Sequence, residues 1–162
     1  MRPELSKEHE MIIDNLKLTG KLNVTLTDKD GNVKEEREID NLVVNAGLAY
    51  IASRMVGTAK SVMSHMAVGS STTAAAAAQT DLISILGTRK ALTSTTISGT
   101  NNEKVVYVAT FAATESTGAI TEAGVFNAST GSDMLCRTTF AVVNKGADDS
   151  LTITWTITLA AV

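Results

Sequence analysis

The sequence predicts an all-β protein: an antiparallel β-sandwich or jelly-roll-like domain with one short amphipathic helix and an N-terminal arm. Apolar and polar residues alternate with a period of two over several segments, and polar turns separate those segments. Proline occurs once, whereas β-branched threonine, which favours strands, is abundant. The length of 162 residues suits one compact domain, so we assign residues 1–15 to the arm and residues 16–162 to the sandwich.

The N-terminal part combines a charged segment with a predicted β-hairpin. The arm carries charges of both signs and shows no sustained period. From Leu16 to Thr27, apolar residues alternate with polar ones, as in a strand with one buried face. Asp30-Gly31 suits a tight turn, so residues 33–44 should pair back on the first strand. The charges in the first half of this second strand suit an exposed sheet edge.

One helix is predicted over residues 46–56. Asn45 can cap its first turn, and Gly57 is placed to end it. Apolar residues recur at helical spacing and should face the sheet; they are Leu48, Ile51, Ala52, Met55 and Val56. The helix is therefore expected to cover one side of the sheet.

The segment after the helix contains one predicted strand and two less regular stretches. The strand covers residues 62–68. The alanine run Ala74–Ala78 is compatible with either a helix or an extended loop. Residues 82–86 follow Thr80-Asp81 and are interpreted as a short helix.

The C-terminal half reads as a series of strands divided by polar turns. They are expected over residues 89–98, 104–112, 120–127, 134–144 and 151–159. The last is the clearest, because large apolar residues occupy its odd positions and threonines its even ones. The predicted interior holds Leu22, Val24, Leu26, Leu48, Ile51, Phe111, Phe126, Phe140, Ile153, Trp155 and Ile157.

Composition and charge restrict the partners and the compartment. The formal net charge of -3 lacks the basic excess of most nucleic-acid-binding domains, so no nucleic acid is expected as a partner. Cys136 is the single cysteine, which excludes an intramolecular disulfide. No segment has the character of a signal peptide or a membrane span. We expect a soluble protein, made in the cytoplasm, with no membrane partner.

The residues that could support catalysis are few and scattered. His65 lies in a predicted strand, where a hydrogen-bonded structural histidine is expected, and His9 in the arm should be solvated. Cys136 alternates with neighbouring apolar residues, which favours a small buried side chain over a reactive thiol. The sequence therefore predicts no catalytic residue and no enzymatic activity.

One segment is superficially similar to a ligand-binding motif. Residues 28–32 read Asp-Lys-Asp-Gly-Asn, like the start of a calcium loop, but Ile39 occupies the position of the closing glutamate. A hairpin turn explains these residues better. The glycines are dispersed and form neither a phosphate-binding loop nor a dinucleotide fingerprint. We expect no cofactor-binding site and no metal site.

Several segments resemble the small structural proteins of tailed bacteriophages. In chain order they are Asn41–Leu48, His65–Thr73, Ile120–Asn127, Arg137–Phe140, Val143–Gly146 and Leu151–Trp155. Together they extend over nearly all of the predicted domain. The resemblance implies a non-enzymatic virion structural protein and carries over no catalytic residue.

Within that class, the expected function is that of a capsid decoration or cement protein, which binds and stabilises the phage head shell. A small acidic domain with an arm suits attachment in many copies. The expected partners are further copies of the chain, with a trimer favoured, and virion proteins such as the major capsid protein; synthesis would take place in the host cytoplasm. A tail, baseplate or fibre-attachment protein is the alternative. A carbohydrate-binding module is a weaker one, because aromatics make up only 4% of the residues.

Overall fold

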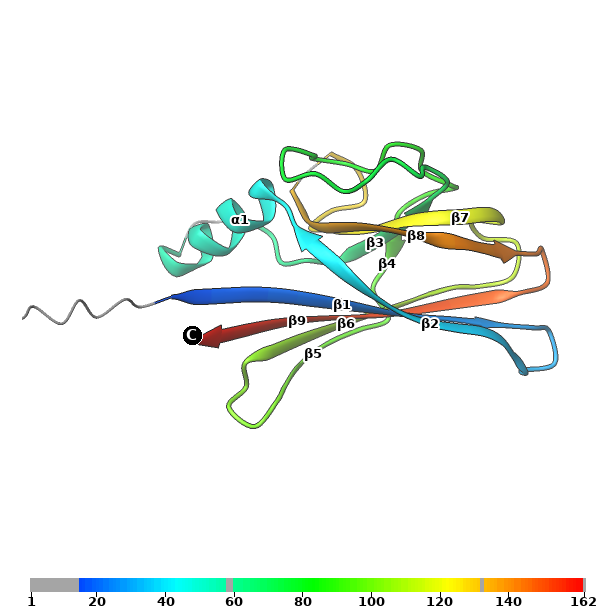
Figure 1. The fold of residues 1–162 in the computed structure, drawn as a ribbon, viewed down its shortest axis with the longest axis horizontal. Helices are drawn as coiled ribbons and strands as arrows, with labels where there is room; N and C mark the ends of the chain where they lie inside the picture. Colours follow the sequence, from blue (N-terminus) through cyan, green and yellow to red (C-terminus); the bar gives the residue numbers. More distant parts are fainter. Residues whose placement is uncertain (1–14, 58–59, 132, 162) are drawn as a thin grey trace, which may run out of the picture.

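The computed structural model describes residues 15–57, 60–131 and 133–161, and these residues form one curled sheet and one helix (Figure 1). The predicted arm, apart from Asn15, lies outside the described residues. The elements are β1 (Leu16–Thr27), β2 (Val33–Val43), α1 (Asn45–Met55), β3 (His65–Gly69), β4 (Lys90–Ala91), β5 (Ser94–Ser98), β6 (Lys104–Phe111), β7 (Gly118–Phe126), β8 (Met134–Lys145) and β9 (Ser150–Ala161).

The sheet folds over at β2 and so forms two layers. Its strand order is β4-β3-β7-β8-β2-β1-β9-β6-β5, with antiparallel pairing throughout. β2 pairs with β1 over a long register but reaches β8 only through Leu42 and Val43. We call β4, β3, β7 and β8 the upper layer and β2, β1, β9, β6 and β5 the lower layer, as they lie in Figure 1. The all-β fold class with one short helix is confirmed.

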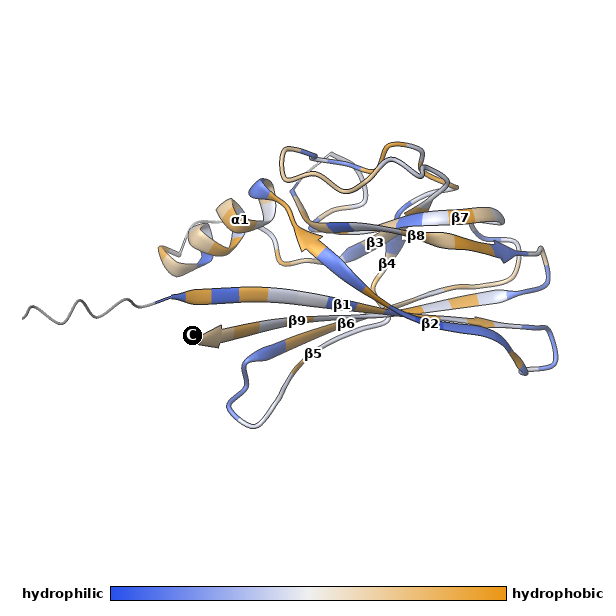
Figure 2. Cartoon of the chain, viewed as in Figure 1, coloured by the Kyte–Doolittle hydropathy of each residue, from blue (hydrophilic) through white to orange (hydrophobic). Residues whose placement is uncertain are grey.

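The main core lies between the two layers. Trp155, Phe111, Leu22 and Ile153 are buried there, and along β9 buried residues alternate with partly exposed threonines as predicted. Figure 2 shows the same alternation of hydropathy along β1. A second, smaller cluster around Phe126 lies under the β3–β4 loop, residues 70–89. Of the other residues predicted to be interior, Ile51 and Phe140 are partly buried.

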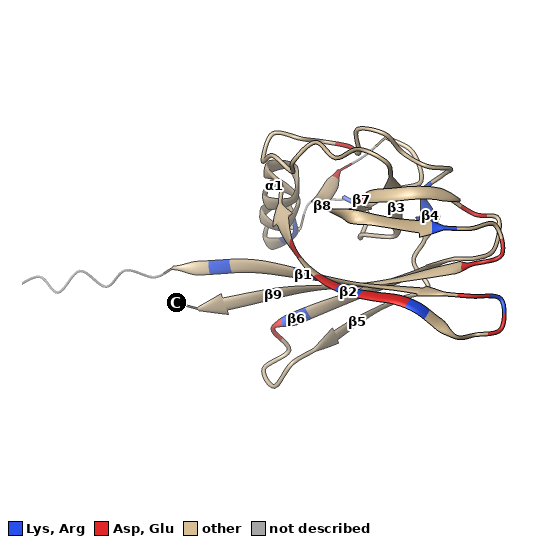
Figure 3. Cartoon of the chain, turned by 45° about the vertical axis from the view of Figure 1, so that its right-hand side comes forward, with Lys and Arg blue, Asp and Glu red and all other residues tan. Residues whose placement is uncertain are grey.

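The first hairpin forms as the sequence predicts. Gly31 adopts a φ of 86°, and the Asp28 carboxylate accepts hydrogen bonds from the backbone N–H groups of Asp30 and Asn32, both at 2.9 Å. β2 has no strand beside Val33–Asn41 on its side away from β1, and Figure 3 shows this stretch as strongly charged. The prediction of a charged sheet edge is therefore confirmed.

The helix has the predicted position but is rotated, so that most of its predicted inward face is exposed. Leu48 is 48% exposed and Met55 is 83% exposed, whereas Gly47 and Tyr50 are buried. The prediction that Leu48 is interior is therefore wrong. The reason is packing at Gly47, where a Cβ atom would lie 2.1 Å from the carbonyl oxygen of Leu135. Only glycine permits this close approach, so the helix turns its Gly47 face toward β8.

The helix ends differ in how well they were predicted. Asn45 is the first helical residue rather than the cap; Val44 occupies the cap position and makes no side-chain capping bond. The backbone N–H of Asn45 donates instead to the carbonyl of Ala77 at 2.8 Å. Gly57 ends the helix as predicted, with a φ of 69° and a bond from its N–H to the Arg54 carbonyl.

The region from Val62 to β4 corrects two further predictions and decides one open alternative. Val62 lies outside β3, which begins at His65. The Ala74–Ala78 run belongs to the β3–β4 loop and is not helical. Residues 82–86 are not a helix either, because the N–H groups of Ser84 and Ile83 donate to the Glu122 carboxylate rather than to helical carbonyls.

The predicted strand over residues 89–98 is divided into β4 and β5. The chain crosses here from the upper to the lower layer. The N–H of Leu92 donates to the Ser64 carbonyl at 2.9 Å, and the N–H of the next residue, Thr93, donates to the Val108 carbonyl at 2.7 Å. Because successive residues bond to different layers, a continuous strand cannot form.

Candidate interaction surfaces

The residues considered for catalysis lie in separate places. His65 on β3 is partly buried, and its Nδ1 lies 2.8 Å from the hydroxyl of Ser64, which confirms the expected hydrogen-bonded histidine. Cys136 on β8 is fully buried, and this burial raises the pKa of its thiol well above the ordinary value. β7 separates the two strands, so the fold does not combine His65 and Cys136 into one site. His9 lies outside the described residues.

The turn at residues 28–32 is held by its own hydrogen bonds. The bonds that Asp28 accepts, first of all from Asn32, lower the pKa of its carboxyl group. Within the ranges that the structure describes, no group of three or more His, Cys, Asp and Glu side chains is placed to hold a metal ion. In the same part of the chain, no helix is both long and apolar enough to span a membrane.

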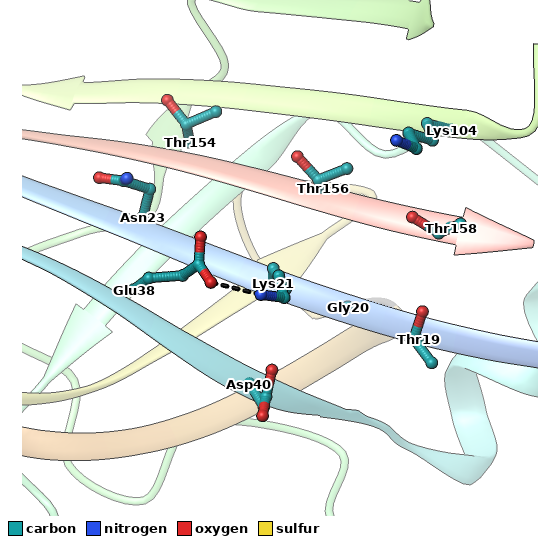
Figure 4. Close-up of a pocket in the computed structure, with 10 residues that line it drawn as sticks. All are labelled: Thr19, Gly20, Lys21, Asn23, Glu38, Asp40, Lys104, Thr154, Thr156 and Thr158. Atoms are coloured by element: carbon teal, nitrogen blue, oxygen red, sulfur yellow. Dashed lines mark hydrogen bonds and ion pairs between the residues drawn. The ribbon is translucent and has the colours of Figure 1, made fainter. Parts of the chain in front are cut away.

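A broad hollow lies on the outer face of the lower layer (Figure 4). Its volume is about 660 Å³, and its wall consists of Thr19, Gly20, Lys21, Asn23, Glu38, Asp40, Lys104, Thr154, Thr156 and Thr158. Thr154, Thr156 and Thr158 come from the outward positions of β9, the central strand of this layer. Their short side chains lie between longer charged ones on β1, β2 and β6, and this difference in height makes the face concave.

Hydroxyl groups and one ion pair dominate the chemistry of this face. Lys21 on β1 donates a hydrogen bond to Glu38 on β2, and this bond raises the pKa of Lys21. Both side chains are more than half exposed, so the pair contributes little to stability. The face offers donors and acceptors in regular array and has no catalytic grouping among the residues that line it. We call it the threonine face.

A second hollow, apolar in character, opens at the end of the sandwich beside α1. Its volume is about 200 Å³, and it is lined by Tyr50, Ile51, Arg54, Val105, Tyr107, Leu135, Ile157 and Leu159. These residues come from α1, β6, β8 and β9. Burial of Tyr107 in this wall raises the pKa of its phenol. We call this hollow the end groove.

The exposed apolar residues of α1 continue the end groove on the surface. Met55 follows Ile51 by one helical turn, and Leu48 precedes it by nearly one, so the three lie on one face of the helix. Val56, directly after the helix, is 77% exposed. The sequence reveals this apolar stripe, but its periodicity was interpreted as a contact with the protein's own sheet. Ile51 packs against the core, whereas Leu48, Met55 and Val56 are exposed in the described chain.

A buried ion pair fixes the outer side of the upper layer. Arg137 on β8 donates to the Glu122 carboxylate on β7 at 2.9 and 2.7 Å, and both side chains have no exposed surface. Glu122 also accepts the N–H of Ser84 at 2.7 Å, and Arg137 donates to the carbonyl of Thr73 at 3.0 Å. These bonds hold the β3–β4 loop on the layer, so the pair has a structural role.

The sequence contains a signal for this pair that periodicity does not reveal. Glu122 and Arg137 each stand alone as a charge in the central part of adjacent predicted strands, and their charges are opposite. A single charge in a buried strand requires a partner. Antiparallel pairing of the two strands would have placed these residues close together.

Comparison with known proteins adds no assignment: no family model, no curated protein and no solved structure matches the chain. The geometry defines the class as an all-β protein with two antiparallel layers. Its candidate functional surfaces are the threonine face and the end groove with the adjoining stripe of α1.

Proposed function

We propose that the protein is a non-enzymatic virion structural protein, and that it acts as a decoration or cement protein on a phage head shell. The observation that carries this proposal is the group of exposed apolar side chains on α1 beside the end groove. Large apolar residues gathered in this way are typical of a surface that another protein covers. The segments that resemble phage structural proteins support the same function.

The two surfaces suit a protein that works in an array. A component that occupies repeated positions on a shell needs one surface for the shell and another for its neighbours. The threonine face is broad and lined mainly by polar and charged residues, like a contact that forms after independent folding. The end groove is apolar, like the contact between subunits of a stable oligomer. We propose that the chain contacts further copies of itself, as a trimer, and the major capsid protein.

Electron microscopy of labelled particles tests the location. Antibody raised against the purified domain would be applied to virions from a lysate in which the protein is produced. Label at symmetric positions over the heads is the expected result. Label confined to tails would replace the decoration role by a tail or baseplate role, and particles without label would overturn the virion assignment.

Removal of the arm tests how the protein attaches. Deletion of residues 1–15 should leave the domain folded, because Leu16 is the first residue of β1, while attachment to particles becomes weaker. Circular dichroism would report the fold, and co-sedimentation with particles would report attachment. Equal co-sedimentation of the truncated and intact proteins would remove the arm from the mechanism.

A further inference from the structure

We infer that the end groove receives the segment Met11–Ile13 from the arm of a second copy of this chain. The inference deepens the proposed function, since it rests on self-association of the protein and names the contact that forms it. Four observations support it: the shape of the groove, the exposed apolar side chains of α1, the sequence of the arm and the place where the arm joins the sheet.

The end groove has the size and chemistry of a site for aliphatic side chains. Aromatic and aliphatic residues from four elements form its wall, and Arg54 supplies a charge. Its volume of about 200 Å³ exceeds the roughly 150 Å³ of an apolar cavity that holds a benzene-sized group. The groove can therefore accept an isoleucine or methionine side chain from outside.

The stripe of α1 enlarges this site beyond the groove itself. Ile51 lies in both, because it lines the groove and also belongs to the apolar face of the helix. Leu48 and Met55 flank it at helical spacing and are exposed. A peptide with several consecutive apolar residues can fill the groove with one side chain and cover the stripe with the next.

The sequence of the arm supplies such a peptide. Met11-Ile12-Ile13 is a run of three large apolar residues between Glu10 and Asp14. Arg54 in the groove wall is complementary to the acids that flank this run. In residues 1–14 the other large apolar residues stand singly.

The join between arm and sheet places the run near a groove. Leu16 is paired with Ala161 at the end of the ladder, and Leu18 is paired with Leu159, which lines the groove. The ladder thus continues two residues past the groove before the arm begins.

This geometry favours exchange between copies over docking on the same chain. Only Asp14 and Asn15 separate the apolar run from Leu16, so docking on the same chain would require a reversal of direction within those two residues. A second copy facing this end needs no reversal. Ile12 lies four residues before Leu16 and so at most about 13–14 Å from it, which is enough to reach the groove of a second copy that abuts this end of the domain. Mutual exchange of arms would close the oligomer.

Disulfide trapping between two separate variants tests the contact directly. Ile12→Cys protein would be mixed with Leu159→Cys protein under mild oxidation, and peptides joined by a disulfide would be identified by mass spectrometry. Such a bond between separate chains forms preferentially when the arm of one copy lies on the groove of another. The matched control mixes Ile12→Cys with Ile97→Cys, a 67% exposed site on the β5 edge. Cys136 is buried and does not compete.

The expected result is preferential trapping, on the order of tenfold over the control, because docking raises the local concentration of the two thiols. Equal yields in the two mixtures would overturn the inference. A double Ile12→Cys and Leu159→Cys variant that forms only bonds within one chain would also overturn it, since the arm would then dock on its own domain.

A second pair of variants measures the consequence for assembly. Ile12→Asp with Ile13→Asp should shift the protein to monomer in sedimentation experiments, while circular dichroism shows that the domain stays folded. Ser6→Asp with His9→Asp adds the same charge outside the apolar run and should leave association intact. Identical behaviour of the two variants would contradict the inference. If antibody labels the virion heads but no disulfide is trapped, the proposed function stands and the arm contact is refuted. If the disulfide is trapped but no particle is labelled, the arm contact stands and the proposed function is refuted.

Discussion

β9 and β7 are both long strands, yet only β9 shows the pattern of a half-buried strand. Along β9, residues on one face are buried while the threonines on the other are partly exposed. In β7, every residue from Ile120 to Phe126 is buried. The β3–β4 loop covers the outer side of the upper layer, whereas the threonine face of the lower layer remains open. Alternation of apolar and polar residues therefore indicates that one face of a strand is exposed to solvent. A strand that is buried on both faces does not show it.

Truncation of the largest core residue on β9 should give the largest loss of stability. Trp155→Ala leaves a cavity between the layers and should lower the free energy of unfolding by about 3–5 kcal/mol. Trp155→Phe is the matched control. It should cost less, because the indole Nε1 has no hydrogen-bond partner in the described structure. Urea unfolding measures both, and an unchanged midpoint for Trp155→Ala would show that this side chain does not support the core.

Removal of the buried charge of Glu122 on β7 should lower the free energy of unfolding nearly as much. Glu122→Ala leaves Arg137 buried without its partner, so we expect a loss of about 3–5 kcal/mol in urea unfolding. The double variant Glu122→Leu with Arg137→Met removes both charges and should recover part of this loss. A double variant less stable than Glu122→Ala would show that the pair acts mainly through its bonds to the loop.

These two sites illustrate what the sequence could predict. The residues of β9 that face the core could be predicted, because apolar and polar residues alternate regularly within this one segment. The partnership of Glu122 and Arg137 requires knowledge of which strands are adjacent and of the loop that covers them. The division between β4 and β5 could not be predicted from the residue pattern either, because the N–H groups of Leu92 and Thr93 bond to the carbonyls of residues distant in sequence.

The candidate surfaces were predictable only in part. The apolar stripe of α1 is plain in the sequence, but its direction depends on Gly47, a residue that a hydrophobic pattern ignores. The end groove is built from α1, β6, β8 and β9, so nothing local in the sequence reveals it. The threonine face follows from the alternation of β9, although its hollow depends on the neighbouring strands.

Substitution of Gly47 tests why the helix faces as it does. In Gly47→Ala the new Cβ would collide with the Leu135 carbonyl, and the helix would have to move away from β8. Overpacking of this kind should cost about 1–3 kcal/mol in thermal or urea unfolding. Ala49→Gly, at an exposed position of the same helix, is the control for helix propensity alone. A Gly47→Ala variant as stable as the unmodified protein would refute the close contact.

The turn between β8 and β9 should make stability depend on acid pH. Bonds from Lys34 and from the N–H of Gly146, both at 2.8 Å, lower the pKa of Asp149 below its ordinary 3.8. A depressed pKa in the folded state means that this stabilisation is present above pH 3.8 and is lost as the pH falls through the lower, folded value. Asp149→Asn should flatten the acid side of a stability profile measured by urea unfolding. Asp148→Asn, at the exposed neighbour, should retain it.

The smallest effect is expected on the threonine face, where it separates stability from binding. Thr154→Val with Thr156→Val should change the free energy of unfolding by no more than about 0.5 kcal/mol, because their outward hydroxyls lie in an open hollow. The same change at Thr138 on β8 should cost about 1–3 kcal/mol, since its buried hydroxyl donates to the Asp40 carbonyl at 2.8 Å. If the threonine face contacts the shell, the double variant should co-sediment less with particles while it melts normally. Equal destabilisation by both sets of changes would mean that the hydroxyls of the threonine face support the fold as much as the buried hydroxyl of Thr138 does.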